Sequence, residues 1–352
     1  MTTHTIPPGR RIRVLIVDDS LFMRAAIAKT LSGPQFEIVG QAKSGDDALA
    51  QVAKLLPDVI TMDFNMPGMN GADTVRALMQ QRPTPVVMFS AHTKQGAKQT
   101  FDALAAGAVE FVTKPAGEIS VDLSKISEEL TRKVIAAAAS RPRPTTSPPV
   151  PRQRGAAARA MSSTLPGGLP RLCVIAVSTG GPAALGEVIP ALPGDLRIAI
   201  VVVQHMPAGF TAALAERLDS ASEVSVCEAA DGMRPLAGTV LIAPGDRHVE
   251  FDDRGMVVLG DGPQVNGCRP AADVTMQSAA KVYGRRSLGV VMTGMGKDGA
   301  AGALAIKRVE GRTLAQDKES SVIYGMPKAA IDAGAIDEVA ALSDIAAWLR
   351  YV

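Results

Sequence analysis

The stretch VIAVSTGG at residues 174–181 is a short apolar run that ends in a glycine-rich turn, and VMTGMGKDG at residues 291–299 repeats this pattern. Between them, IAIVVVQH at residues 198–205 is a third apolar run, and it ends in an imidazole. Apolar runs of this length are typical of parallel strands that are buried on both faces of a sheet. We therefore expect three such strands whose ends present Ser178, His205 and Asp298, the groups of a hydrolytic triad.

Strand and helix signals alternate on both sides of these runs. In the C-terminal part, strands are predicted at 172–177, 198–203, 224–229, 288–293, 312–315 and 336–339, and helices begin near Pro182, Ala208, Ala271, Gly299, Gly325 and Leu342. Turn signals at 244–246 and 252–255 separate the segments 239–243, 248–251 and 256–259, which predicts an antiparallel hairpin attached to a mainly parallel sheet. Ligands of open α/β sheets bind at the carboxyl ends of strands, where Ser178, His205 and Asp298 fall.

The N-terminal part repeats this alternation. Strands are predicted at 13–17, 37–42, 59–62, 85–90 and 110–113, with helices between them at 20–31, 45–56, 71–80 and 95–106. Because the central strands are apolar throughout, we predict a flavodoxin-like (βα)5 domain with a parallel sheet. The whole chain is thus predicted to be α/β, with two doubly wound domains.

The composition supports two globular domains joined by a linker. The 352 residues are enough for two cores, and 47% apolar with 20% charged residues describe an ordinary globular protein. Five prolines between residues 141 and 151 and eight basic residues without an acidic one between 131 and 171 mark a segment that buries little apolar surface. We predict a first domain at 1–131, a flexible linker at 132–171 and a second domain at 172–352. The basic charge is interpreted as a solvated linker, with a docking patch for an acidic partner as the alternative.

The sequence also limits where in the cell the protein is expected and which roles its cysteines can have. No apolar run approaches the ~20 residues of a membrane span, and the first apolar run, at 14–17, is too short for a secretion signal. We therefore expect a cytoplasmic protein that is not inserted in a membrane. Cys173, Cys227 and Cys268 are odd in number and irregularly spaced, so neither a disulfide framework nor a zinc site is supported. Cys268 is predicted to lie in a loop and is the one to test for reactivity.

Charged side chains gather at the predicted strand ends of the first domain. Asp18 and Asp19 follow its first strand, Asp63 follows the third, Ser90 ends the fourth and Lys114 follows the fifth. Three carboxylates in one crevice repel each other unless a hard cation neutralises them, and Mg²⁺ prefers oxygen ligands. A carboxylate beside Mg²⁺ and a lysine can attack a phosphoryl group, because both cations offset the charge of its oxygens.

Four motifs in this order resemble a response-regulator receiver domain over roughly residues 12–130: VDDS at 17–20, MDFNMPGMNG at 62–71, FSA at 89–91 and TKP at 113–115. The resemblance implies that Asp63 accepts a phosphoryl group from a histidine kinase. It further implies that Mg²⁺ is held by Asp18, Asp19, Asp63 and the carbonyl of Asn65, that Ser90 and Lys114 contact the phosphoryl group, and that the aromatic ring of Phe111 reorients on phosphorylation.

The C-terminal candidates form a chemically sensible set. Serine is a weak nucleophile without a base, His205 has a suitable reference pKa, and Asp298 would fix the tautomer of the imidazole. Backbone N–H groups near Met295 and Gly296 could stabilise an oxyanion. Alternatives are a phosphate-binding turn at 178–181, although the dinucleotide spacing is missing, and an imperfect P-loop at 296–297. Cys268 in place of Ser178 as the nucleophile is a further alternative.

Five motifs make this half similar to the catalytic domain of the CheB methylesterase family over roughly residues 172–350. They are STGGP at 178–182, QHMPAGFT at 204–211, IAPGDRH at 242–248, TGMGKDGAAG at 293–302 and AQDKESSVIYGMP at 315–327. The resemblance implies Ser178 as nucleophile, His205 as general base and Asp298 as the carboxylate that orients it. The Met295 N–H would be an oxyanion donor, and Thr179 would assist beside the nucleophile. Val177, Gly267 and Cys268 depart from the usual residues of the family.

The two resemblances together imply a phosphorylation-regulated hydrolase that removes methyl groups from glutamyl γ-methyl esters of chemoreceptors, and that could also deamidate receptor glutamines. Mg²⁺ is expected only in the receiver domain, with no cofactor in the catalytic domain. The unmodified receiver would cover the catalytic cleft, and a chemotaxis histidine kinase would be the phosphodonor of a monomeric protein. One rival is a non-catalytic binding module under the same control. A DNA-binding regulator is the other, but no basic recognition helix appears, so no nucleic-acid partner is expected.

Overall fold

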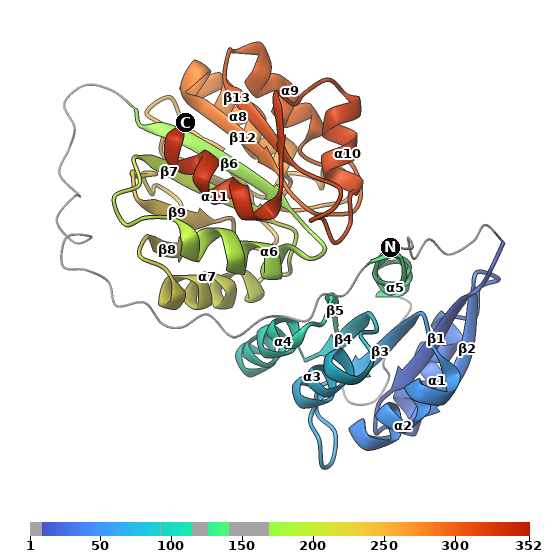
Figure 1. Ribbon diagram of the computed structural model, residues 1–352. Helices are drawn as coiled ribbons and strands as arrows, with labels where there is room; N and C mark the ends of the chain where they lie inside the picture. Colours follow the sequence, from blue (N-terminus) through green and yellow to red (C-terminus); the bar gives the residue numbers. More distant parts are fainter. Residues whose placement is uncertain (1–8, 92, 115–125, 141–168) are drawn as a thin grey trace. The chain divides into compact units, whose positions relative to one another are not determined.

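The computed structural model describes residues 9–91, 93–114, 126–140 and 169–352 (Figure 1). The chain separates into two compact units at the junction of Pro148 and Pro149. Both are α/β units with a parallel main sheet, so the predicted fold class is confirmed.

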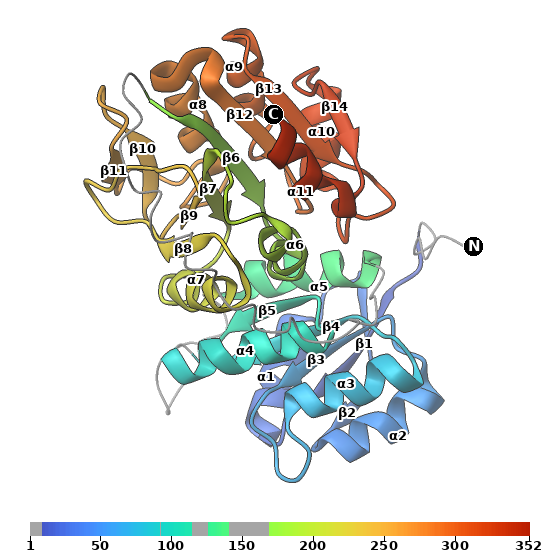
Figure 2. The same cartoon turned by 60° about the vertical axis from the view of Figure 1, so that its left-hand side comes forward.

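The N-terminal unit contains five parallel strands in the order β2-β1-β3-β4-β5. The strands are β1 (Ile12–Val17), β2 (Phe36–Ala42), β3 (Val59–Asp63), β4 (Val86–Ser90) and β5 (Glu110–Thr113), and the helices are α1 (Leu21–Thr30), α2 (Gly45–Leu55), α3 (Gly71–Gln81), α4 (Lys94–Ala106) and α5 (Ser127–Ala139). Figure 2 shows α2, α3 and α4 side by side on one face of this sheet, with α1 and α5 on the other. After β1 the chain adds β2 on one side of it, and then β3 and the later strands on the other side. At such a change of side, a crevice forms at the carboxyl ends of the two strands concerned, here β1 and β3.

Polar side chains determine where four of these helices begin. Ser20, Ser44, Asn70 and Thr93 each accept a hydrogen bond from the backbone N–H three residues ahead. Such N-caps satisfy a donor that the first helical turn leaves free. The cap at Ser20 starts α1 immediately after Asp18 and Asp19, which keeps both carboxylates in the turn at the end of β1.

The predicted boundary at residue 131 is wrong, because α5 continues through residues 132–139, the first part of the predicted linker. Leu130 and Val134, four residues apart, are fully buried on one side of α5, and the helix contacts β3, β4 and β5. The alanines that follow favour the helix, so the basic charge of this segment does not prevent its ordering. Residues 141–168 of the predicted linker lie outside the described residues, and Arg171 at its end is the first residue of β6.

The main sheet of the C-terminal unit has seven parallel strands in the order β14-β13-β12-β6-β7-β9-β8. They are β6 (Arg171–Val177), β7 (Ile198–Gln204), β8 (Ser225–Glu228), β9 (Thr239–Ile242), β12 (Ser287–Val291), β13 (Arg312–Gln316) and β14 (Glu338–Ala340). The helices are α6 (Gly181–Val188), α7 (Phe210–Ala221), α8 (Ala272–Tyr283), α9 (Ala300–Arg308), α10 (Gly325–Asp332) and α11 (Leu342–Tyr351), with short 3-10 turns at Ile189–Ala191 and Gly284–Arg286. Helices α6 and α11 pack together on one face, and α8 and α9 on the other (Figure 1).

The three segments around the predicted hairpin do not all belong to it. Strands β10 (His248–Phe251) and β11 (Val257–Gly260) pair antiparallel, as predicted, in a small sheet of their own that contacts α8. The third segment, β9, instead lies parallel between β7 and β8. Val240, Leu241 and Ile242 are buried, which explains why this strand is taken into the main sheet.

The position of β6 determines where a site can form. The chain moves from β6 toward β7 on one side and later returns to β12 on the other. This reversal leaves a crevice at the carboxyl ends of β6, β7 and β12. Strands β7 and β12 are buried at every residue, and the first polar residues after them, His205 and Thr293, lie at the edge of the buried core. Among the described residues, no helix is long and apolar enough to span a bilayer.

Candidate functional site

Two of the three predicted catalytic side chains are in direct contact. His205 directly follows β7, and Asp298 lies in the turn between β12 and α9. Nε2 of His205 lies 2.7 Å from Oδ2 of Asp298, and both side chains are largely buried. Since β7 and β12 are the two neighbours of β6, the sheet order brings together residues that are 93 positions apart.

The Asp298 carboxylate accepts three more hydrogen bonds from the start of α8 and the turn before it. The N–H of Ala272 donates to Oδ2 over 2.6 Å, the N–H of Asp273 to Oδ1 over 3.0 Å, and the Asn266 amide to Oδ1 over 3.1 Å. Burial by itself would raise the pKa of Asp298, but the hydrogen bonds from His205 and the backbone of α8 lower it below its ordinary value. Asp298 is therefore ionised at neutral pH, as a group that stabilises an imidazolium must be.

The contacts of His205 identify the ring nitrogen that can act as a base. An ionised carboxylate only accepts, so Nε2 carries a proton toward Asp298 and the neutral ring keeps its lone pair on Nδ1. Nδ1 lies 3.5 Å from Sγ of Cys268, and that thiol also reaches the carbonyl oxygen of Asn266 at 3.7 Å. Burial disfavours the imidazolium, but the hydrogen bonds with Asp298 and Cys268 outweigh it and raise the pKa of His205 to about 9.

Ser178 occupies the turn between β6 and α6, beside the loop that follows β12. Its N–H donates to the carbonyl oxygen of Thr293 over 3.0 Å, and its own carbonyl oxygen accepts from Nε2 of Gln204 over 3.1 Å. A Cβ added to Gly294 would lie 2.8 Å from Cβ of Ser178, so only glycine allows this close approach. Within the described part of the chain, no hydrogen bond joins Oγ of Ser178 to His205. Proton transfer between them therefore stays a prediction.

Two backbone N–H groups, one in the turn of Ser178 and one in the neighbouring loop after β12, have no hydrogen-bond partner among the described residues. They belong to Thr179, which follows Ser178 at the start of α6, and to Met295, which follows Gly294. The neighbouring N–H groups of Ser178 and Gly294, in contrast, donate to carbonyl oxygens. A backbone N–H without a partner can donate to an oxyanion, so the free N–H of Met295 is compatible with its predicted oxyanion role. That role and the assisting role predicted for Thr179 stay predictions.

Several residues around the site were missed by the sequence analysis. Val322 packs against Gly180, where a Cβ would lie 2.7 Å from Cβ of Val322 and where φ is +79°. Thr293 ties this segment to the site, because its Oγ1 accepts from the N–H of Ile323 over 3.0 Å. Asn266 and Asp273 both contact Asp298. The only signal for them was the Asn-Gly pair at 266–267, which predicts a turn but not what the turn faces.

In the N-terminal unit, the structure brings Asp18, Asp19 and Asp63 together. One carboxylate oxygen from each lies within 4.8 Å of the others. Nζ of Lys114 lies 2.9 Å from Oδ1 of Asp63 and 3.5 Å from Oδ2 of Asp18. Burial raises the pKa of Asp18 despite Lys114, and its Oδ2 accepts no hydrogen bond from the described residues. A buried carboxylate oxygen that accepts no hydrogen bond fits a site for a hard divalent cation.

The other predicted receiver residues belong to strands or turns next to this cluster, and two of them, Ser90 and Phe111, make contacts with other groups. Oγ of Ser90 donates to the carbonyl oxygen of Gly96 over 3.0 Å and accepts from Thr100 over 2.6 Å. Phe111 is buried in β5, with Nζ of Lys133 5.0 Å from its ring centre. Asn65 is exposed two residues after Asp63. The roles predicted for these residues toward Mg²⁺ and a phosphoryl group stay predictions.

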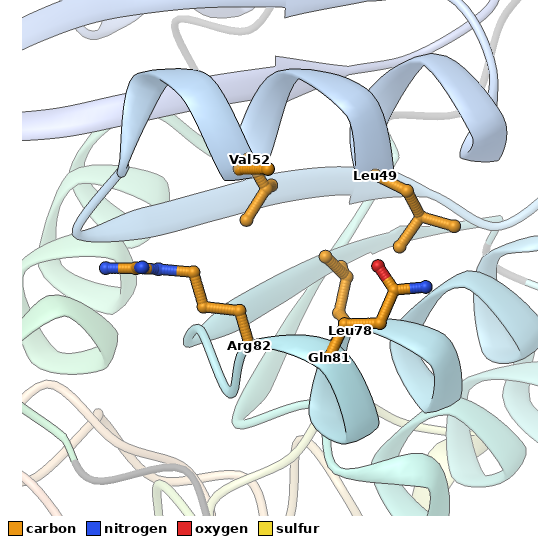
Figure 3. Close-up of a pocket in the computed structure, with 6 residues that line it drawn as sticks. Leu49, Val52, Leu78, Gln81 and Arg82 are labelled. Carbon is orange, nitrogen blue, oxygen red and sulfur yellow. The ribbon is translucent and has the colours of Figure 1, made fainter.

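A hollow of about 230 Å³ lies between α2 and α3 of the same unit (Figure 3). It is lined by Leu49, Val52, Ala53, Leu78, Gln81 and Arg82. None of these is a predicted site residue, and most of the lining is aliphatic, so the hollow carries no candidate chemistry.

Comparisons with known proteins agree with this division of the chain. Residues 14–122 match the response regulator receiver domain, and residues 173–349 match the CheB methylesterase domain. Proteins of Symbiobacterium thermophilum and Bacillus subtilis, both called protein-glutamate methylesterase/protein-glutamine glutaminase, are 47% and 44% identical to this chain. Each alignment covers 96% of this chain, and 96% and 97% of the respective relative. The crystal structure of the Thermotoga maritima CheB methylesterase catalytic domain is 45% identical, with a TM-score of 0.50, and covers 51% of this chain and 97% of that one.

Proposed function

The chain belongs to the CheB methylesterase family of receiver-linked hydrolases, and from this we propose that it hydrolyses glutamyl γ-methyl esters of chemoreceptors with Ser178 as nucleophile. The observation that carries the proposal is the buried contact of 2.7 Å between His205 and Asp298, at the same sheet edge as Ser178. The proposed partners are methylated receptors as substrate and a chemotaxis histidine kinase as phosphodonor. We further propose that the protein acts as a cytoplasmic monomer.

In the proposed acylation step, Nδ1 of His205 takes the proton of Ser178 Oγ, and Oγ attacks the ester carbonyl carbon. The new oxyanion accepts hydrogen bonds from the N–H groups of Thr179 and Met295, which are free of other partners among the described residues. The imidazolium is stabilised by Asp298 and then protonates the leaving methanol.

In the proposed deacylation step, His205 removes a proton from water, which attacks the acyl carbon and releases glutamate and free Ser178. A glutamine side chain would follow the same route with ammonia as the leaving group, because the acyl-enzyme is identical. The names of the relatives, which include protein-glutamine glutaminase, support this second substrate.

The alternative nucleophile Cys268 gains support from one contact, since its Sγ lies 3.5 Å from Nδ1 of His205. Ser178 is favoured because it follows β6, the strand between β7 and β12, whose following residues supply His205 and Asp298. The resemblance of the motif STGGP at 178–182 to the family also implies a nucleophile at this turn. The Cys268→Ala variant should therefore still release a burst of methanol in its first turnover. The Ser178→Ala variant should show no such burst. The reverse result would assign the nucleophile to Cys268.

The raised pKa of His205 predicts an unusual pH dependence. The base must be neutral to take a proton, so kcat/KM should rise with pH through an apparent pKa of about 9, well above the ordinary value of 6.5. Asp298→Asn removes a hydrogen bond that raises the pKa of His205. In this variant the rise of kcat/KM with pH, the acid limb of the profile, should therefore move toward lower pH, at much reduced activity. Methanol release measured from pH 6 to pH 10 tests both statements, and a wild-type limb at or below 6.5 would contradict them.

We propose that phosphorylation of Asp63 raises the esterase activity. Mg²⁺, held by Asp18, Asp19, Asp63 and the Asn65 carbonyl, would supply positive charge that offsets the phosphoryl oxygens. Asp63 would attack the phosphorus atom of the phosphodonor, and the bond between that phosphorus and the donor would break as the new P–O bond forms. Lys114, whose Nζ lies 2.9 Å from Oδ1 of Asp63, would pair with the transferred group. For Ser90 to reach a phosphoryl oxygen, its hydroxyl must leave the carbonyl oxygen of Gly96.

The proposed function is tested by methanol release from methylated receptors, measured with and without a small phosphodonor. We expect release by the unmodified protein, faster release with phosphodonor and Mg²⁺, and no dependence of basal release on a metal chelator. Receptor binding without any methanol release would favour the non-catalytic binding module.

A further inference from the structure

Asn266 occupies a tight turn that lies against the catalytic pair. Asn266 and Gly267 both have left-handed backbones, with φ of +53° and +74°. The turn is closed on both sides, because the N–H of Val265 donates to Cys268 over 3.1 Å and the N–H of Cys268 donates to Val265 over 2.9 Å. Two central residues of positive φ between paired flanking residues form a type I′ turn, for which Asn-Gly is a preferred sequence.

The side chain of Asn266 bridges two buried carboxylates. Its Nδ2 lies 3.1 Å from Oδ1 of Asp298 and 2.8 Å from Oδ2 of Asp273. An amide nitrogen carries two hydrogens, so it can donate one to each acceptor, and the carbonyl end of the amide could serve neither. Asp273 is itself fixed at the start of α8, where its Oδ1 accepts from the N–H groups of Gly299 and Gly302.

We propose that Asn266 is a positioning residue that holds Asp298 against His205, because its amide allows the carboxylates of Asp298 and Asp273 to be ionised side by side. This inference rests on the proposed esterase function. Two buried negative groups that face each other repel, and one of them would take up a proton or turn away. The amide removes this conflict because it gives each carboxylate a donor. Asp298 can then remain ionised with its Oδ2 directed at His205.

The side chain, rather than the turn, is what asparagine contributes here. Glycine adopts a left-handed backbone more readily than asparagine, so the turn alone does not require an amide. The groups that titrate around Asp298 are His205 after β7, Cys268 in the turn, which faces it through His205, and Asp273 in α8. Asn266 is the side chain that contacts both carboxylates in the described part of the chain.

Two substitutions separate the amide from the turn. Asn266→Gly keeps the left-handed backbone and removes the amide. We expect kcat to fall roughly tenfold with KM unchanged, because this is the effect expected from the loss of one hydrogen bond to a charged group. Asn266→Asp keeps the shape but replaces the donor by a third carboxyl, and the fall should reach roughly a hundredfold at neutral pH. In Asn266→Gly the acid limb of kcat/KM should also move to lower pH, because a poorly held Asp298 raises the pKa of His205 less.

Glu310→Gly is the matched control, since Glu310 is an exposed residue with φ of +63° before β13, at the opposite ends of the strands. We expect full activity from it. Thermal melts of all three variants report folding separately from turnover. Normal kcat and an unshifted acid limb in Asn266→Gly would overturn the positioning role, as would equal losses in both variants without a shift. Absence of turnover by the wild-type protein would instead reject the esterase function itself.

Discussion

Replacement of Ser178 by alanine is expected to lower kcat for methyl ester hydrolysis by about 10⁴-fold or more, the loss typical when a serine nucleophile is removed. The substitution deletes the oxygen that would form the acyl-enzyme, and no other group at the turn can replace it in that geometry. Ser178 is 5% exposed, and the bonds that hold the turn use its backbone N–H and carbonyl. The fold should therefore persist, and methanol release with a thermal melt measures both effects.

Ser222→Ala is the matched control for this experiment. Ser222 is a buried serine at the end of α7, and its Oγ has no hydrogen-bond partner among the described residues. The same chemical change there should leave both kcat and the melting temperature near the wild-type values. Activity of Ser178→Ala within tenfold of the wild type would remove Ser178 as the nucleophile, and Cys268 would be the next residue to test.

Replacement of Asp63 by asparagine is expected to abolish the activation by a small phosphodonor, so that the ratio of stimulated to basal methanol release falls to one. An amide cannot attack the phosphorus atom to form an acyl phosphate. The change also removes the negative partner of Lys114, which lies 2.9 Å away, and one of the three carboxylates that gather there. Basal activity should remain, because none of the predicted catalytic residues lies in this unit.

Asp73→Asn provides the comparison within the same unit. Asp73 is exposed in the first turn of α3 and pairs with Arg76, so it carries the same charge without belonging to the carboxylate cluster. We expect full activation in this variant. An undiminished response to phosphodonor in Asp63→Asn would contradict phosphorylation at this residue, whatever the basal rate.

Local pattern was sufficient to predict most strands and helices of both units. Apolar runs such as 198–203 are strands because burial on both faces of a parallel sheet demands it, and polar N-caps mark where α1 to α4 begin. The sequence pattern gave a wrong prediction where charged residues belong to a helix whose other face is buried. The basic residues at 132–133 suggested a linker, but α5 buries Leu130 and Val134, and the stem of Lys133 lies along the core.

The sequence alone determined which chemistry is available: a hydroxyl, an imidazole and a carboxylate at the ends of apolar runs, and a separate set of three carboxylates with a lysine. It did so because strand ends and glycine turns are local properties of the chain. Only the tertiary structure decided that Nε2 of His205 faces Asp298, that Nδ1 faces Cys268, and that Asn266 joins Asp298 to Asp273. These contacts depend on the order of β7, β6 and β12 and on side-chain rotamers, which spacing along the chain does not contain.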